Sequence, residues 1–177
     1  NIPFTVGGGI RSIDDVRAII DAGADKISLN SAAVKNPALI SGIAEEFGKQ
    51  CVVIAVDVKK QEENWEVFIN SGKTPTSLDA LGWCRKCQLL GAGEILLTSM
   101  NQDGTGNGFA LDITARVAGA LTIPVIASGG AGSVADFVSL FRNSNASAAL
   151  AAGIFHYNRI SLTELKQALK IEGISIR

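Results

Sequence analysis

Short apolar segments alternate with amphipathic segments six times along the chain, and no other feature of the sequence limits the fold as strongly. The segment 51–58 is apolar at every position except Asp57. Continuous apolar strands joined by helices are typical of a parallel sheet that is buried on both faces. The sequence therefore predicts an α/β fold of about six βα units in one domain, residues 1–177. The other strands are expected at 4–6, 26–30, 94–98, 125–127 and 147–151.

Capping residues, prolines and glycines indicate where the helices begin and end. Pro37 is expected to open a helix that ends at Gly48. Thr76 and Asp79 have the spacing of a capping box and predict a helix from about residue 76 to Gly91. Residues 65–70 alternate in polarity, which favours a hairpin arm before that helix. Further helices are expected after Ser12 with Asp15, near 111–121, after Ser133 with Asp136, and after Ser161 with Glu164.

Cys84 and Cys87 form a CxxC motif, which in redox proteins lies at a helix N-terminus that lowers the thiol pKa. Here both cysteines fall well inside an expected helix, so a packing role is favoured. A zinc site would need two more ligands, and the sequence has no second CxxC motif or histidine pair. Three cysteines in total are too few for a disulfide scaffold and favour a reducing, cytoplasmic compartment.

The charge balance excludes two classes of partner. The chain has 16 basic and 17 acidic residues and a formal net charge of −1, which gives no basic footprint for nucleic acid or for an acidic membrane surface. Its apolar segments are short and interrupted, so none is expected to span a membrane.

Two segments 121 residues apart resemble each other, which indicates an internal repeat. Gly8-Gly9 recurs as Gly129-Gly130, and the capping residue Ser12 recurs as Ser133. Each copy is a βαβ unit with a Gly-rich turn after its first strand, and two such copies fit a barrel built of similar halves. Backbone N–H groups in a Gly-rich turn before a helix can approach an anion closely. We therefore expect two phosphate sites rather than two merely tight turns.

Polar residues at two other strand ends are candidates for chemistry. Asp57 ends the most apolar strand, where active sites of parallel α/β folds lie. A general acid–base role and a salt bridge with Lys59 or Lys60 are equally supported by the sequence. The polar, Gly-rich loop 98–108 follows another strand and is either a mobile active-site loop or an ordinary connection. His156 has no nucleophile in a recognisable motif and is expected to be structural.

Further motifs run along the whole chain and include FTVGGGI at 4–10, AVD at 55–57, SGK at 71–73, LLTS at 96–99, DGT at 103–105, ASGGAG at 127–132 and IFH at 154–156. Together they resemble the cyclase subunit of imidazole glycerol phosphate synthase. The sister isomerase of histidine biosynthesis is a poorer match, and a non-catalytic phosphate-binding assembly module is a third possibility.

The resemblance implies a (β/α)₈ barrel of the TIM type and a lyase reaction of histidine biosynthesis in the cytoplasm. Ammonia from a glutaminase partner, docked on the N-terminal face of the barrel, would react with a bis-phosphorylated aminoimidazole-carboxamide ribonucleotide. The products would be imidazole glycerol phosphate and a carboxamide ribotide. The family requires no metal and no organic cofactor, and two aspartates act as general acid and base.

The resemblance also assigns roles to individual residues. Asp57 matches one of the two catalytic aspartates, and Lys26 and Glu94 match members of a charged gate for ammonia. Ala152 stands where many members have a serine, which would remove one hydroxyl from a clamp. The first phosphate clamp would comprise Gly9, Asn30 and Ser31, and the other side of the site Thr98, Asp103, Gly104, Ser128, Gly130, Ala151 and Ala152.

This chain departs from the family pattern at its N-terminal end, because it begins at what would be the third barrel strand. The first two βα units and the first-strand aspartate are absent from the sequence. We therefore expect an incomplete barrel with two open edges, and little or no cyclase activity from this chain alone. Open edges must be paired or covered, so a homo-oligomer is expected through the edge at Phe4 or the edge at Leu150.

Overall fold

A parallel sheet curved into part of a barrel organises the computed structural model, which describes residues 2–176. Its six parallel strands follow the order β1-β2-β3-β6-β7-β8, and an antiparallel pair, β4 and β5, extends from β3. The strands are β1 (Thr5–Gly7), β2 (Lys26–Leu29), β3 (Val52–Gln61), β4 (Asn64–Ile69), β5 (Thr74–Asp79), β6 (Glu94–Ser99), β7 (Val125–Ser128) and β8 (Ala148–Leu150).

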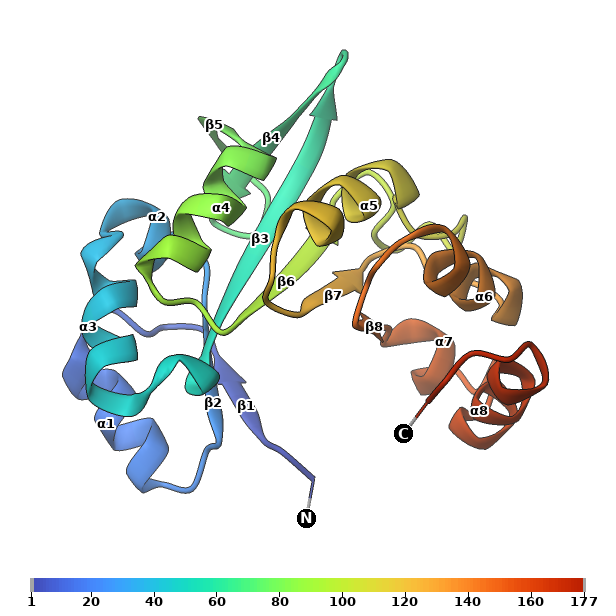
Figure 1. Ribbon diagram of the computed structural model, residues 1–177, viewed down its shortest axis with the longest axis horizontal. Coiled ribbons are helices and arrows are strands. Elements are labelled where there is room, and N and C mark those ends of the chain that lie inside the picture. Colours follow the sequence, from blue (N-terminus) through green and yellow to red (C-terminus); the bar gives the residue numbers. More distant parts are fainter. Residues whose placement is uncertain (1, 177) are drawn as a thin grey trace.

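Helices connect successive parallel strands and cover the outer side of the arc (Figure 1). The two shortest helices, which directly follow β2 and β8, were not predicted from the sequence: α2 (Ser31–Lys35) and α7 (Gly153–His156). The full set is α1 (Ile13–Asp21), α2 (Ser31–Lys35), α3 (Ala38–Phe47), the 3₁₀ turn η1 (Lys49–Cys51), α4 (Ala80–Leu90), α5 (Leu111–Ala120), α6 (Val134–Asn143), α7 (Gly153–His156) and α8 (Leu162–Ile171).

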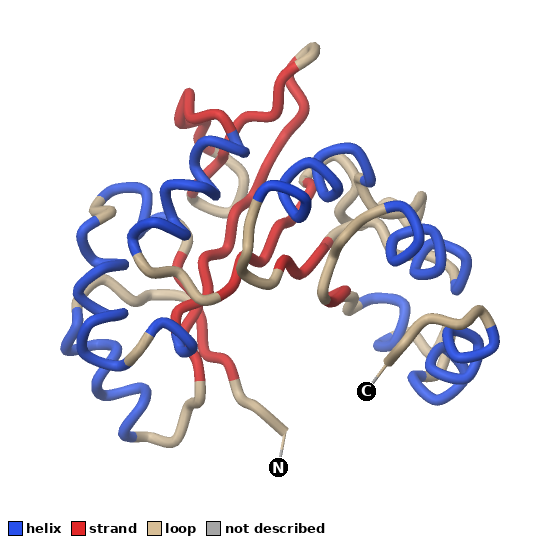
Figure 2. Tube along the Cα trace, in the orientation of Figure 1, coloured by secondary structure: helices blue, strands red, loops and turns tan. Residues whose placement is uncertain are grey.

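The sheet is an incomplete barrel, as the sequence predicts. Among residues 2–176, β1 and β8 each pair with one neighbour and not with each other. Figure 2 shows the strands as a curved row with both chain ends on its open side. The side chains of Phe4 and Leu150, at the two edges, are 60% and 44% exposed. No helix in the described part of the chain is long and apolar enough to cross a membrane.

The two faces of the sheet differ in burial, which corrects the expectation that both would be covered. Strand residues that face the helices, such as Ile27, Ile54 and Ile95, are fully buried. Residues of the opposite face, such as Ser28 and Ala55, remain partly exposed. The helices lie on one side only, so the inner face of the arc is open to a ligand.

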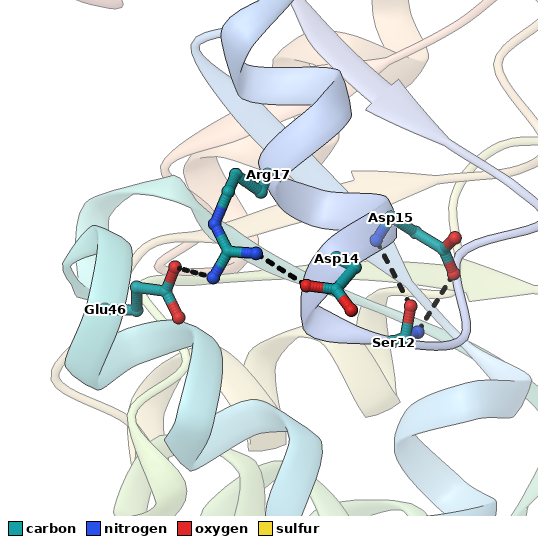
Figure 3. A network of polar contacts seen from close by, with 5 residues as sticks. All are labelled: Ser12, Asp14, Asp15, Arg17 and Glu46. Atoms are coloured by element: carbon teal, nitrogen blue, oxygen red, sulfur yellow. Dashed lines mark hydrogen bonds and ion pairs between the residues drawn. The ribbon is translucent and has the colours of Figure 1, made fainter.

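Capping boxes fix the helix starts that the sequence predicts. The Ser12 hydroxyl accepts a hydrogen bond from the Asp15 N–H at 3.2 Å, and the Asp15 carboxylate accepts one from the Ser12 N–H at 3.0 Å (Figure 3). Arg17 bonds Asp14 at 2.5 Å and Glu46 at 2.6 Å, and so joins α1 to α3. These pairs are exposed to solvent, so each contributes little to the stability of the fold.

The expected helix start at Thr76 is wrong. Residues Thr74–Asp79 form β5, which pairs with β4, and α4 begins only at Ala80. The Thr76 hydroxyl donates to the Val67 carbonyl at 2.7 Å, and the Ser77 N–H donates to the Glu66 carboxylate at 2.7 Å. These hydrogen bonds hold the segment extended against the hairpin, and Asp79 alone caps the helix.

The CxxC cysteines pack inside α4, as expected. Cys84 and Cys87 are both fully buried and free. Burial raises the pKa of Cys84 to about 12, and the nearby Asp79 carboxylate is a smaller cause of the same rise. The Cys84 thiol therefore stays protonated at neutral pH. A protonated, inaccessible thiol has no redox role.

Candidate functional site

The carboxyl ends of the parallel strands bring the predicted site residues to one end of the sheet. Asp57 on β3 is the Cα partner of Thr98 on β6, and Thr98 is in turn the partner of Ser128 on β7. These three residues therefore form a row across the middle of the sheet. The Gly-rich turns after β1 and β7 lie on either side of this row.

A cavity of about 690 Å³ lies at the carboxyl ends of β1 and β2 and beside the middle of β3. Its lining includes Gly9, Asn30, Ser31 and Asp57, so all the residues predicted for the first clamp meet the predicted catalytic aspartate there. Gly8 and Gly9 have φ angles of +96° and +75°. This left-handed backbone favours glycine.

A second cavity, of about 240 Å³, lies at the ends of β7 and β8. Gly130 has a φ of +102°, and a Cβ atom there would lie 2.1 Å from the Gly108 carbonyl oxygen. The Gly108 N–H donates to the Gly130 carbonyl at 2.7 Å, which ties the loop 98–108 to the Gly-rich turn. The predicted residues that line this cavity are Asp103, Gly104, Ser128, Gly130, Ala151 and Ala152. Thr98 lines neither cavity.

Asp57 is half-buried, and the Asn30 side chain donates a hydrogen bond from Nδ2 to its Oδ2 at 2.9 Å. Burial raises the pKa of the Asp57 carboxyl, the Asn30 hydrogen bond opposes this rise, and the charge of Asp103 adds to it. A carboxyl group with a raised pKa can both take and give a proton closer to neutral pH.

The alternative role for Asp57, a salt bridge with a following lysine, is wrong. The Lys59 ammonium donates to the Gly72 carbonyl at 2.9 Å and lies 4.6 Å from the centre of the Phe68 ring. Lys60 lies 3.8 Å from the Asp112 carboxylate. Neither lysine pairs with Asp57, so the carboxylate stays available to the cavity.

The two predicted gate residues lie at the opposite end of the sheet. Lys26 begins β2 and Glu94 begins β6, and their side chains form a partly buried ion pair. The pair bridges over β3, which lies between the two strands. It therefore lies on the N-terminal side of the sheet, away from the two cavities.

Comparison with known proteins identifies the family of this chain. Residues 1–161 match a family model described as "Histidine biosynthesis protein". The imidazole glycerol phosphate synthase subunit HisF of Alkaliphilus metalliredigens is 55% identical over 177 residues, which cover 99% of this chain and 70% of that protein. The chain belongs to the HisF family. HisF subunits of Clostridium botulinum strain Okra and of Natranaerobius thermophilus are 55% and 53% identical, with the same coverage.

Several residues of this chain line the cavities without having been predicted. Arg11 and Lys35 add positive charge to the first cavity, and Tyr157 and Arg159 line the second. No local motif marks these four, although Arg11 comes only two residues after Gly9 in the Gly-rich turn.

The loop after β4 is a further part of the first cavity that the sequence missed. Asn70 and Ser71 line it, and their φ angles of +55° and +58° are unusual for residues with side chains. The Asn70 N–H donates to the Ser31 hydroxyl oxygen at 3.0 Å. The SGK motif at 71–73 was the available signal, since it is part of the HisF resemblance. The hydrogen bond from the Asn70 N–H uses only the oxygen of the Ser31 hydroxyl, so the hydroxyl hydrogen is available for a ligand.

The described residues, 2–176, contain no group of three or more His, Cys, Asp or Glu side chains that could hold a metal ion. The donors in the two cavities are backbone N–H groups, hydroxyls and cationic side chains instead. Such donors suit anions, and two cavities suit a ligand with an anionic group at each end.

Proposed function

We propose that this chain provides the cyclase site of imidazole glycerol phosphate synthase, a carbon–nitrogen lyase of histidine biosynthesis. The reaction cyclises and cleaves a bis-phosphorylated aminoimidazole-carboxamide ribonucleotide with ammonia, and yields imidazole glycerol phosphate. The observation that supports this most is the position of Asp57 on β3, where it lines the first glycine-lined cavity and lies in register, through Thr98, with Ser128 of the second. The HisF relatives favour this reaction over that of the sister isomerase.

Each cavity would hold one phosphate of the substrate. The Gly-rich turn after β1 precedes α1, and the turn after β7 precedes α6, so both present N–H groups beside a helix N-terminus. Arg11 and Lys35 would balance the charge of one phosphate, and Arg159 that of the other. The substrate would then stretch across Asp57.

Asp57 would act as one of the two acid–base groups of the reaction. The resemblance places the second aspartate on a barrel strand that comes before β1 in the family. We therefore expect little or no turnover from the present chain by itself, and full activity only where that second carboxylate is supplied.

A glutaminase subunit would supply the ammonia from the N-terminal side of the sheet. The partly buried pair of Lys26 and Glu94 lies on that side and is the candidate gate. We place this reaction in the cytoplasm. We also propose that the open β1 and β8 edges pair between copies of this chain.

Replacement of Asp57 tests the proposal in a form of the protein that turns over the substrate. Asp57→Asn should lower ammonia-dependent cyclisation by about 10²–10⁴-fold, because proton transfer is lost. Binding of the substrate should change little, since the phosphates bind elsewhere. Asp21→Asn makes the same chemical change at the exposed end of α1 and should leave turnover intact. Undiminished turnover by Asp57→Asn would contradict the assignment.

A further inference from the structure

The side chain of Asn30 does not cap the helix that follows it, although its position in the chain suggests that role. Asn30 follows β2 and is the N-cap residue of α2, a place where asparagine usually accepts a hydrogen bond from the first helical turn. In this structure the side chain makes no capping hydrogen bond. It donates instead from Nδ2 to Oδ2 of Asp57, at 2.9 Å across two neighbouring strands.

The other end of the same amide is buried without a partner. Oδ1 of Asn30 accepts no hydrogen bond within the described structure. A residue placed only to stabilise the fold would normally satisfy both ends of a buried amide. The bond to Asp57 is therefore the contact that determines how this side chain lies.

A phosphate-binding role fits this side chain poorly. Phosphate oxygens accept hydrogen bonds, as the unpartnered Oδ1 of Asn30 also does, and one of the two Nδ2 hydrogens is already donated to Asp57. The neighbouring Ser31 is better placed for that role, because its oxygen is bonded by the Asn70 N–H and its hydrogen remains to be donated. The two adjacent residues thus have different partners.

We propose that Asn30 is a positioning residue for Asp57, which holds one carboxylate oxygen and leaves the other facing the cavity. This inference rests on the proposed function and deepens it. It also replaces the phosphate-clamp role that the resemblance assigns to the Asn30 side chain. The amide donor favours the ionised carboxylate and so opposes the rise in the Asp57 pKa that burial causes.

The other charged groups around Asp57 are few, which makes the effect of Asn30 measurable. Asp103, in the loop after β6, raises the pKa of Asp57, as burial does, and only the Asn30 bond lowers it. On β4, Glu66 is bonded by the Ser77 N–H. The cations nearby are Arg11 and Lys35, which line the same cavity, and Lys59 and Lys60, which bond Gly72 and Asp112.

The test is an NMR titration of the Asp57 side-chain carboxyl in this chain. Asn30→Leu keeps the approximate volume and removes the donor, so the pKa of Asp57 should rise. Asn30→Asp covers the case in which leucine prevents folding, and it should raise that pKa as well, because a second carboxylate repels the first. Asn143→Leu makes the same chemical change at an exposed residue of α6, away from both cavities, and is the matched control.

Binding of inorganic phosphate, measured on the same variants, separates the two roles. Asn30→Leu should change the phosphate Kd by less than about twofold, whereas Ser31→Ala should weaken binding by about fivefold or more, the loss of one hydrogen bond to a charged group. An unchanged Asp57 pKa in Asn30→Leu, or a loss of phosphate binding equal to that of Ser31→Ala, would overturn the positioning role. Neither result bears on the proposed function, which fails only if Asp57→Asn turns over the substrate normally.

Discussion

Gly130 has less room than almost any other residue around the site. Its φ is +102°, and the space where a Cβ atom would lie is taken by the carbonyl group of Gly108. Gly9 has a similar backbone, with φ at +75°, but nothing lies within 4 Å of its Cβ position. Glycine is therefore required at Gly130 by close packing as well as by backbone conformation, and at Gly9 by backbone conformation alone.

Alanine at these two positions should show the difference in urea unfolding. Gly130→Ala should lower the free energy of unfolding by about 3 kcal/mol or more, because a buried clash adds to backbone strain. Gly9→Ala should cost about 1 kcal/mol, from backbone strain alone. Gly119→Ala, inside α5 with open space around it, should stabilise the protein by up to about 1 kcal/mol. Equal losses of stability at Gly9 and Gly130 would contradict the close packing of Gly130 against the Gly108 carbonyl.

Asp57 and the glycines could be predicted from the sequence because their signals are local. An acid at the end of an apolar strand and a Gly-rich turn can each be recognised within a few residues. The bond from Asn30 to Asp57 and the bond from Asn70 to Ser31 could not be predicted, because each depends on how strands far apart in the chain pair.

At the scale of elements, the boundary between β5 and α4 shows how local patterns compete. Thr76 and Asp79 have the spacing of a capping box, yet the hairpin hydrogen bonds extend the chain up to Asp79. Asp79 then caps α4 itself, with its carboxylate 2.7 Å from the Gly82 N–H. Tertiary contacts with β4 thus overrode the capping pattern that predicted a helix start near Thr76. The other capping pairs had no competing strand partner, and their helices begin where expected.

Substitution of Asp79 checks this boundary. Asp79→Ala should lower the free energy of unfolding by about 1 kcal/mol, the usual cost of a lost N-cap, as measured by urea denaturation. Asp79→Asn keeps an oxygen that can accept from Gly82 and should retain most of that stability. A helix beginning at Thr76 would make Thr76, not Asp79, the costly position.

On the scale of the whole molecule, the open arc is the dominant feature (Figure 1). Six βα units were predictable because strand and helix periodicities alternate clearly along the chain. The open inner face could not be predicted, because an apolar strand has the same sequence pattern whether its second face packs against helices or lines the inside of a barrel. The exposed backbone groups of β1 and β8, beside Phe4 and Leu150, leave two edges for association.

Light scattering at micromolar concentration tests whether copies of this chain associate through these edges. We expect a dimer or higher oligomer, since paired edges satisfy backbone groups and cover apolar side chains. Phe4→Lys and Leu150→Lys should each dissociate the assembly or make the protein insoluble. Leu89→Lys alters a leucine that is 85% exposed on α4, away from both edges, and should change nothing. A stable, monodisperse monomer of the unsubstituted chain would refute this expectation.

The most direct test of the site as a whole is an amide NMR titration of this chain with inorganic phosphate. The account predicts chemical-shift changes in two separate sets of backbone amides. One set comprises Gly9 and Ser31 at the first cavity, and the other Gly130 and Ala152 at the second. Amides at the exposed end of α4, around Leu89, should stay unchanged and serve as the internal reference. Titration to saturating phosphate that shifts neither set would contradict the claim that the two glycine-lined cavities are phosphate sites on either side of Asp57.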